Sequence, residues 1–327
     1  MIDRTDQLTA TTVAGEAPAG RAAARPARRR TSLARRLELT LLLTPALTLF
    51  LTFVLLPIGV AVYYSFFRWS GFGPMENIGL ENYRRALADP VFHLAVEHNL
   101  IIAVLSLVIQ LPLAIGLAML MNRKIRGRTL LRIVVFSPYV LSEAVAAVIW
   151  LLILQPGGFV DQVFSALGLG SLIHEWLADS RIVLYTLFVV ITWKYIGIGT
   201  ILLLAGLQGI PTELREAAAI DGASAWHTTR RIVLPLLGPT IRIQIFLSMI
   251  GSLQLFDIVW IMTLGGPANA SNTMATYLLD HGFKRYEFGF GSAVAVILFL
   301  ICFVFALIYQ RYALRRDTDG ALTRMAG

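Results

Sequence analysis

The chain has 327 residues, of which 57% are hydrophobic and 15% are charged, and its mean hydropathy is +0.70. Soluble globular proteins carry about 25% charged residues, so this composition excludes an ordinary soluble domain and indicates a membrane protein. The single cysteine, Cys302, lies in an apolar run, which excludes a disulfide framework or a thiolate metal site. The net charge of +8 does not indicate a nucleic-acid partner, because the basic residues gather on one side of the predicted membrane segments.

Residues 1–36 contain mostly Ala, Arg, Thr, Gly and Pro and few large apolar residues. Such a segment cannot bury a core, so we predict a disordered tail. Its runs Arg28–Arg30 and Arg35–Arg36 are typical of a polybasic segment next to a membrane. Twin arginines also precede export signals, but the apolar run that follows is too long and no small-residue cleavage site ends it.

Six apolar segments follow, each long enough to cross roughly 30 Å of hydrocarbon with about 20 residues. A lone segment satisfies its backbone in lipid only as a helix, so the predicted fold is all-α. We expect Pro57 and Pro112 to bend the first and second helices locally. The predicted spans are Leu41–Phe66, Asn99–Met121, Ile133–Leu154, Ile182–Leu207, Ile243–Leu264 and Phe288–Tyr309.

The distribution of basic residues predicts the orientation in the membrane. Twenty-one of the 28 Lys and Arg residues lie in the two tails and in the loops after spans two and four; six lie in the other loops. Because basic residues concentrate on the cytoplasmic side, both termini and the loop 211–239 are expected in the cytoplasm.

The loop 211–239 is the longest polar interruption in the second half of the chain and has a readable shape. Thr212, after Pro211, is a predicted N-cap of a short helix. Asp221-Gly222 is expected to end that helix in a left-handed conformation. Ser224 is the predicted cap of a second short helix, which Leu234-Pro235 would stop. This pattern alone is also compatible with an ordinary amphipathic hairpin between membrane helices.

The residues Glu216-Ala217-Ala218, Asp221-Gly222-Ala223, Ile232, Leu234 and Pro235 resemble the "EAA" loop of binding-protein-dependent ABC importer permeases. Thr229 departs from the aromatic that the family usually has there. The resemblance implies a cytoplasmic coupling helix that docks into a groove of an ATPase subunit. The residues expected to couple to the ATPase are Glu213, Glu216, Ala217, Ala218, Asp221 and Gly222.

A second set of residues resembles the carbohydrate-uptake branch of these permeases. The set includes Phe256-Asp257, Thr263, Gly265-Gly266-Pro267, Phe283 and Gly289, together with Trp193-Lys194 and Gly197 in span four. The resemblance covers about Leu37 to Arg311 and is to the first permease of a maltose- or glycerol-phosphate-type pair. It implies a type I importer permease with six transmembrane helices that forms half of a path for an oligosaccharide, disaccharide or glycerol-phosphate-like solute.

The same resemblance implies the partners and the domain layout. The expected partners are a second homologous permease, an ATPase dimer, an extracytoplasmic solute-binding protein and the lipid of a bacterial cell membrane. The predicted layout is a tail at 1–36, a first helix and outer loop at 37–94, a five-helix core at 95–311 and a cytoplasmic tail at 312–327.

The chemistry of an enzyme is absent from the sequence. The lysines Lys124, Lys194 and Lys284 are not preceded by Gly, so no GxxxxGK[ST] phosphate loop exists. The five histidines show no zinc-ligand spacing. We therefore expect no cofactor or metal, with ATP and Mg²⁺ bound by the partner ATPase. The alternatives are an ion-coupled secondary transporter, for which no internal repeat is evident, and a membrane enzyme or scaffold.

Span five carries a face of small and hydroxyl residues at i, i+3, i+4 and i+7. By position in the motif it matches the sugar-facing side of the family, and span four offers two residues at the same depth. The competing interpretation is that small residues only allow close helix packing. The predicted substrate path comprises Tyr195, Ile198, Ser248, Gly251, Ser252 and Leu255.

Three charges fall inside the predicted spans, at Glu143, Lys194 and Asp257. A charge at the bilayer centre costs at least about 2.5 kcal/mol, so each needs a partner or a water-filled cavity. We predict that Lys194 pairs with Asp257 or Glu143, either as a latch between helices or as part of the substrate cavity, and that none of the three faces lipid.

The predicted outer loops carry several aromatic residues. They are interpreted either as an interfacial aromatic belt or as a rim that docks the binding protein. The residues concerned are Tyr83, Phe92, Trp176, Phe283, Tyr286 and Phe288.

Overall fold

The computed structural model describes residues 32–123 and 125–314. The predicted disorder of residues 1–36 lies outside this part of the chain except at its end, where a helix already begins at Ser32. The predicted tail at 312–327 likewise lies mostly outside; its first residues complete a π-helical turn, Gln310–Leu314. Most of the described residues are helical, as the apolar segments predicted.

The chain divides into two compact units, Met1–Leu55 and Leu56–Gly327. The first contains α1 (Ser32–Phe50) and the π-helical turn Leu51–Leu55. Every side chain described in it, from Leu37 onwards, is exposed. An apolar helix without a buried face is the pattern of a helix that lipid surrounds.

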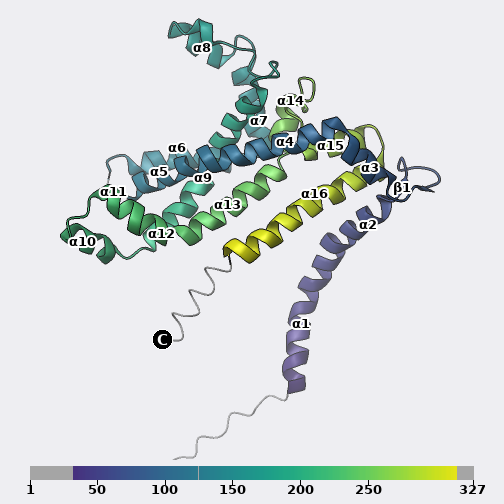
Figure 1. Cartoon of the computed structure of the whole chain (residues 1–327), viewed down its shortest axis with the longest axis horizontal. Coiled ribbons are helices and arrows are strands. Elements are labelled where there is room, and N and C mark those ends of the chain that lie inside the picture. Colours follow the sequence, from purple (N-terminus) through teal and green to yellow (C-terminus); the bar gives the residue numbers. More distant parts are fainter. Residues whose placement is uncertain (1–31, 124, 315–327) are drawn as a thin grey trace, which may run out of the picture. The chain divides into compact units, whose positions relative to one another are not determined.

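The second unit holds the remaining helices (Figure 1). Its first half comprises α2 (Leu56–Tyr64), the antiparallel strands β1 (Phe67–Arg68) and β2 (Glu76–Asn77), α3 (Glu81–Ala88), α4 (Pro90–Leu105), the π turn Ser106–Gln110, α5 (Leu111–Asn122), α6 (Arg128–Val140), α7 (Glu143–Leu154), α8 (Phe159–Ala166) and the 3-10 turn Gly170–Leu172. Its second half comprises α9 (Val183–Gln208), α10 (Thr212–Ile220), α11 (Ala225–Thr228), the π turn Thr229–Val233, α12 (Leu234–Leu236), α13 (Gly238–Leu253), α14 (Asp257–Thr263), α15 (Met274–Leu279), the π turn Asp280–Lys284 and α16 (Phe288–Tyr309).

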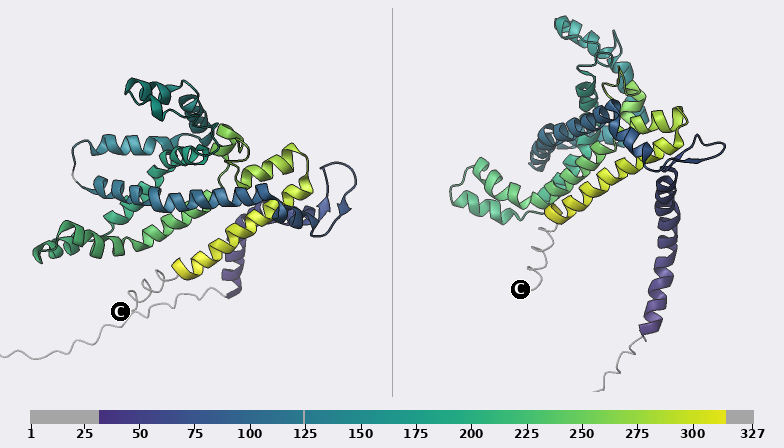
Figure 2. Two further views of the ribbon diagram at one scale, coloured as in Figure 1. Left: turned by 45° about the horizontal axis from the view of Figure 1, so that its top comes forward. Right: turned by 45° about the vertical axis from the view of Figure 1, so that its right-hand side comes forward.

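The long helices of this unit share two ends. The hairpin α10–α12 lies at one end of α9 and α13, and the short elements α3, α14 and α15 lie at the other (Figure 1). The β1–β2 hairpin projects beyond the N-terminal end of α16 (Figure 2). Helix α9 is central: it packs against α4, α5, α6, α7, α13 and α14.

Within the described residues, five helical segments are long and apolar enough to cross a membrane, and a bent pair of helices can form a sixth. The six predicted segments are therefore present. We expected the third to be one continuous helix, but it is broken into two. Helices α6 and α7 meet at an angle of 104°. The second span begins at Pro90 rather than at Asn99. The prediction started too late because His93, Glu97 and His98 interrupt the apolar pattern of the first turns.

The expected local effect of proline takes one repeated form. A five-residue π turn ends two residues before Pro57, Pro112 and Pro235. The wider turn makes room for a ring that would clash with the carbonyl four residues earlier in an α-helix. For the same reason the prediction that Leu234-Pro235 stops the second short helix is wrong, since α12 continues to Leu236.

Glycines in α9 allow neighbouring helices to approach closely. A β-carbon on Gly197 would lie 2.5 Å from the Val135 carbonyl oxygen of α6. One on Gly206 would lie 2.5 Å from the Thr240 hydroxyl of α13. Real β-carbons do not make such contacts, so these positions hold α9 against both neighbours.

Candidate functional site

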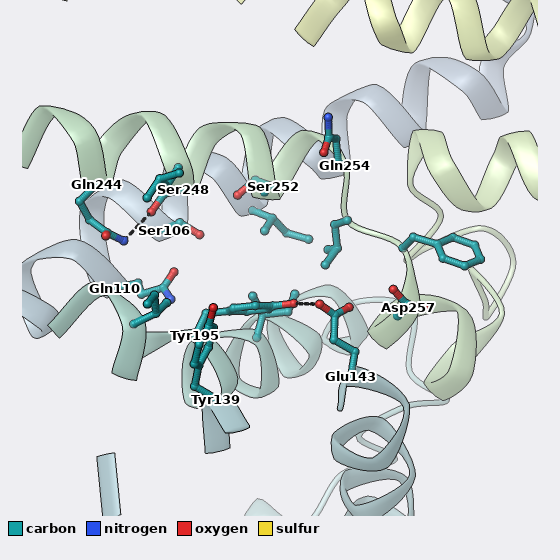
Figure 3. A pocket seen from close by; sticks show the side chains of 17 residues that line it. Ser106, Gln110, Tyr139, Glu143, Tyr195, Gln244, Ser248, Ser252, Gln254 and Asp257 are labelled. Carbon is teal, nitrogen blue, oxygen red and sulfur yellow. Dashed lines mark hydrogen bonds between the residues drawn. The ribbon is translucent and has the colours of Figure 1, made fainter. Parts of the chain in front are cut away.

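Three irregularities in long helices meet at one cavity of about 400 Å³ (Figure 3). The first is the π turn between α4 and α5, which places Ser106 and Gln110 in the lining. The second is the break between α6 and α7, and the third is the segment Gln254–Phe256 between α13 and α14. Irregular backbone at membrane depth is tolerated where it is buried in protein or lines a cavity.

The segment Gln254–Phe256 is held in its non-helical form by side chains from other elements. The Asn99 amide nitrogen donates to the Ser252 carbonyl at 2.6 Å, and the Asn99 amide oxygen accepts from the Met274 backbone N–H at 2.9 Å. The Thr273 hydroxyl donates to the Leu255 carbonyl at 2.8 Å. These bonds satisfy backbone groups that the interrupted helix cannot pair. The non-helical opening of span five at Gln254–Phe256 is therefore stabilised by the rest of the fold.

The break between α6 and α7 has a local cause and a distant partner. Ser142 adopts an extended conformation, and its hydroxyl accepts from the Val145 N–H at 3.2 Å, which starts α7 afresh. The last carbonyls of α6 have no partner in their own helix. Lys194 of α9 supplies one: its ammonium donates to the carbonyls of Pro138, Tyr139 and Leu141 at 3.1, 2.9 and 2.5 Å.

The predicted ion pair of Lys194 with Glu143 or Asp257 is therefore wrong. Within residues 32–123 and 125–314, no cationic group lies within 4.0 Å of either carboxylate. Lys194 is 2% exposed and is satisfied by carbonyl dipoles, which charge spacing along the sequence could not reveal. The Tyr195 hydroxyl donates to Glu143, and the Asp257 carboxylate lies beside that of Glu143 in the cavity lining (Figure 3).

The six residues predicted for the substrate path all line this one cavity: Tyr195, Ile198, Ser248, Gly251, Ser252 and Leu255. Two of the predicted intramembrane charges, Glu143 and Asp257, line it too. A β-carbon on Gly251 would meet nothing within 4 Å, so close helix packing does not account for this glycine. Whether these residues contact a substrate stays a prediction.

Sequence reasoning missed several polar residues of the lining. Ser106 and Gln110 follow Asn99 by seven and eleven positions, which places all three on one face of an apolar helix. Polar groups on one face inside a membrane span indicate a cavity, and this pattern was available in the sequence. The others, Tyr139, Gln244 and Gln254, come from elements whose breaks only the structure shows.

The buried Gln244 side chain carries an unused acceptor. Its amide nitrogen donates to the Ser248 hydroxyl at 3.3 Å. Its oxygen, although buried, accepts no hydrogen bond from any described residue. Buried polar atoms are almost always paired, so this acceptor beside the cavity can take a hydrogen bond from a bound water or ligand.

The predicted hairpin follows the C-terminal end of α9. Helix α10 ends at Ile220 with Asp221 as its C-cap, Gly222 has a φ of +76°, and the Ser224 hydroxyl accepts from the His227 N–H at 3.3 Å, as expected. The expected capping by Thr212 is wrong, because Thr212 is already helical and Pro211 occupies the N-cap without a side-chain bond. Of the predicted coupling residues, Ala218 is buried; Glu213, Glu216, Ala217, Asp221 and Gly222 are exposed.

The hairpin also exposes large apolar side chains. Leu214, Ile220 and Trp226 are 43%, 87% and 69% exposed. They lie on α10 and α11, which pack against each other. Apolar side chains gathered at a loop tip are typical of a protein-interaction surface.

Comparison with known proteins identifies the family to which this chain belongs. The sequence profile of the family described as "Binding-protein-dependent transport system inner membrane component" matches residues 110–317. The trehalose/maltose transport system permease protein MalF of Thermococcus litoralis is 31% identical over 280 residues, which cover 85% of this chain and 94% of that protein. This chain belongs to that family of permeases.

Two further comparisons agree with this assignment. The diacetylchitobiose uptake system permease protein NgcF of Streptomyces coelicolor is 31% identical to the permease over 309 residues, 90% of this chain and 87% of that protein. A chain of a bacterial ABC transporter that imports the acidic polysaccharide alginate shares its fold, with a TM-score of 0.75. That match has 23% sequence identity and covers 86% of this chain and 97% of the other.

The predicted type I importer permease fold and multi-pass membrane character are thereby confirmed. The permease is a component of an ABC importer rather than an enzyme, as predicted, and the alternative of an ion-coupled secondary transporter is set aside.

The aromatic residues predicted for the outer loops of the permease do not form one surface. Phe92 is 2% exposed and packs against Tyr277, and the Trp176 ring nitrogen donates to Asp161 at 2.9 Å. Of the six predicted aromatic residues, only Phe283 and Tyr286 are largely exposed. A docking rim made of all six residues is therefore wrong for Phe92, which belongs to the core.

Proposed function

We propose that this permease forms half of the translocation path for a saccharide and that the cavity is where its helices contact the sugar. The observation that carries the proposal is the buried oxygen of Gln244, unpaired beside a cavity of about 400 Å³. Ligand cavities typically measure about 300–1,000 Å³. The lining combines hydroxyls, amides and carboxylates with the face of Tyr195, which suits the polar edges and apolar faces of a sugar.

The named relatives support the same substrate class. One is a permease of a trehalose/maltose system and another of a diacetylchitobiose system. Each is covered over most of its length, so the likeness extends across the helices that form the cavity.

The coupling role of α10 is part of the proposal. The exposed side chains of Leu214, Ile220 and Trp226 give the hairpin an apolar surface that an ATPase groove can cover. The acidic residues Glu213 and Glu216 lie on the same short helix. The complete importer then contains a second permease, an ATPase dimer that binds ATP and Mg²⁺, and an extracytoplasmic solute-binding protein.

The proposed orientation places both termini and α10 in the cytoplasm of a bacterial cell. Its support is the concentration of 21 of the 28 basic residues in the tails and in the loops on that side. The cavity and the α10–α11 hairpin lie towards different parts of α9, so substrate contact and ATPase contact are separated along one helix.

The test uses the complete importer in proteoliposomes. Maltose, trehalose and diacetylchitobiose are screened for stimulation of ATP hydrolysis and for uptake. Gln244→Leu should raise the KM of the stimulating sugar about tenfold, the effect of losing one buried hydrogen bond. Gln162→Leu changes the same side chain on the exposed helix α8 and should leave KM unchanged. Equal kinetics of both variants would overturn the assignment of the cavity.

A further inference from the structure

The charged residues that line the cavity are all acidic. Seventeen residues line it, and Glu143 and Asp257 are the charged ones among them. The others are serines, glutamines, tyrosines, a glycine and apolar residues. No arginine or lysine of the described chain contributes to this lining.

Lys194 is buried, does not line the cavity, and already has acceptors for its ammonium protons. Its ammonium donates to the carbonyls of Pro138 and Tyr139 in α6 and of Leu141, the C-cap of α6, so its three protons are used. The rings of Tyr139 and Tyr195, which both line the cavity, lie 5.4 and 5.7 Å from it. Lys194 offsets part of the charge of Glu143 but offers no donor to a bound anion.

The two carboxylates are held differently. Glu143 accepts from the Tyr195 hydroxyl and is half-buried, so its position is fixed by α9. Asp257 is exposed to the cavity at the first turn of α14 and has no cationic partner among the described residues. A carboxylate in this position accepts hydrogen bonds from paired hydroxyls or from an ammonium group, and it repels another anion.

We propose that the cavity admits neutral and amino saccharides and rejects anionic ones, such as uronates and sugar phosphates, and that Asp257 is the carboxylate that contacts the substrate. This inference rests on the proposed transport function. It narrows the substrate class, because a glycerol-phosphate-like solute would place its charge against Glu143 and Asp257. It also separates this permease from the alginate importer whose fold it shares, since alginate is acidic.

The electrostatic part is tested without knowing the sugar. In the complete importer, Ser248→Cys is made in a Cys302→Ser background and treated with two methanethiosulfonates of similar size, one trimethylammonium and one sulfonate. Ser165→Cys on the exposed helix α8 is the matched control. The ratio of cationic to anionic labelling rates should be about tenfold or more higher at position 248 than at position 165. Adding Asp257→Asn should lower this ratio several-fold. Equal ratios at the two positions would overturn the proposal.

The substrate part uses three disaccharide probes: diacetylchitobiose, which is neutral; chitobiose, the glucosamine dimer, which is cationic; and digalacturonate, which is anionic. The first two should slow the cationic labelling at position 248 and the third should not. Protection by digalacturonate as strong as by the others would overturn the selectivity. If the charge preference holds but no saccharide protects or stimulates ATP hydrolysis, the sugar-transport proposal fails while the anionic character of the cavity stands.

Discussion

The ammonium nitrogen of Lys194 lies 2.5 Å from the carbonyl oxygen of Leu141, at the point where α6 ends and α7 begins. A buried cation in α9 thus replaces the missing intrahelical partners of a broken span. This relationship connects the most buried charge of the described chain to one wall of the cavity, because Glu143 and Tyr139 lie on the two helices that meet there.

Lys194→Met should remove three hydrogen bonds and leave buried carbonyls unpaired. Each such bond to a charged donor contributes about 1.5–3 kcal/mol, so the variant should unfold several degrees lower than the parent or fail to assemble. The measurement is the thermal unfolding of the purified importer in detergent. Lys194→Arg, which keeps the charge and the donors, should lose less.

A charge swap distinguishes the hydrogen bonds of Lys194 to backbone carbonyls from an ion pair between Lys194 and Asp257. Lys194→Asp combined with Asp257→Lys should be no more stable than Lys194→Asp alone, because the structure shows no ion pair to restore. Recovery in the double variant would show that Lys194 and Asp257 are partners and would contradict the capping role.

Gly222→Val should uncouple transport from ATP hydrolysis. Gly222 has a φ of +76°, where a β-carbon costs about 1 kcal/mol or more, so the turn between α10 and α11 should change shape. Gly168 has nearly the same φ, +74°, and no atom within 4 Å of an added β-carbon, as at Gly222. Gly168→Val therefore carries similar strain away from the hairpin and should transport normally. Membrane abundance is measured for both; normal coupling in Gly222→Val would argue against α10 as the coupling helix.

Asn99→Leu should alter the cavity from a distance. Asn99 is fully buried and connects the end of α13 to the start of α15, so the variant leaves a carbonyl and an N–H unpaired. We expect a loss of about 2 kcal/mol or more in stability and a raised KM for the stimulating sugar. Asn122→Leu, at the half-exposed end of α5, is the control and should change neither quantity. A variant at position 99 with the parent's KM would show that the opening at Gln254–Phe256 does not depend on this amide.

The π turn Asp280–Lys284 and the residues packed on it should be sensitive to acid. Burial lowers the pKa of His281, which packs on Tyr277 with ring centroids 4.3 Å apart and lies 3.3 Å from a Glu287 oxygen. The folded state therefore holds this proton less tightly than the unfolded state, so the contribution to stability is full above the unfolded pKa of about 6.5 and falls as the pH drops below it.

The melting temperature of the importer, measured from about pH 8 down to about pH 5.5, should decline in this window. His281→Gln should flatten the decline, whereas His174→Gln, at an exposed position, should keep it. An unchanged profile in His281→Gln would assign the acid sensitivity to other groups.

The sequence by itself determined the fold class, the number of apolar segments and the face of span five that lines the cavity. These follow from local rules: an apolar segment in lipid must form a helix, and residues at i, i+3, i+4 and i+7 share its face wherever the helix packs. Ser248, Gly251, Ser252 and Leu255 therefore line one cavity as predicted, and Gly222 adopts the left-handed conformation that its place after a short helix requires.

Only the tertiary structure decided where helices stop inside the membrane and which group each charge faces. The break at Leu141-Ser142 and the opening at Gln254–Phe256 lie in apolar runs, and both depend on donors that are distant in sequence, Lys194 and Asn99. A backbone carbonyl carries no signature in a sequence, so pairing charges by depth matched Lys194 with carboxylates. Its actual partners are peptide groups, because a broken helix leaves them unpaired and a buried ammonium must find acceptors.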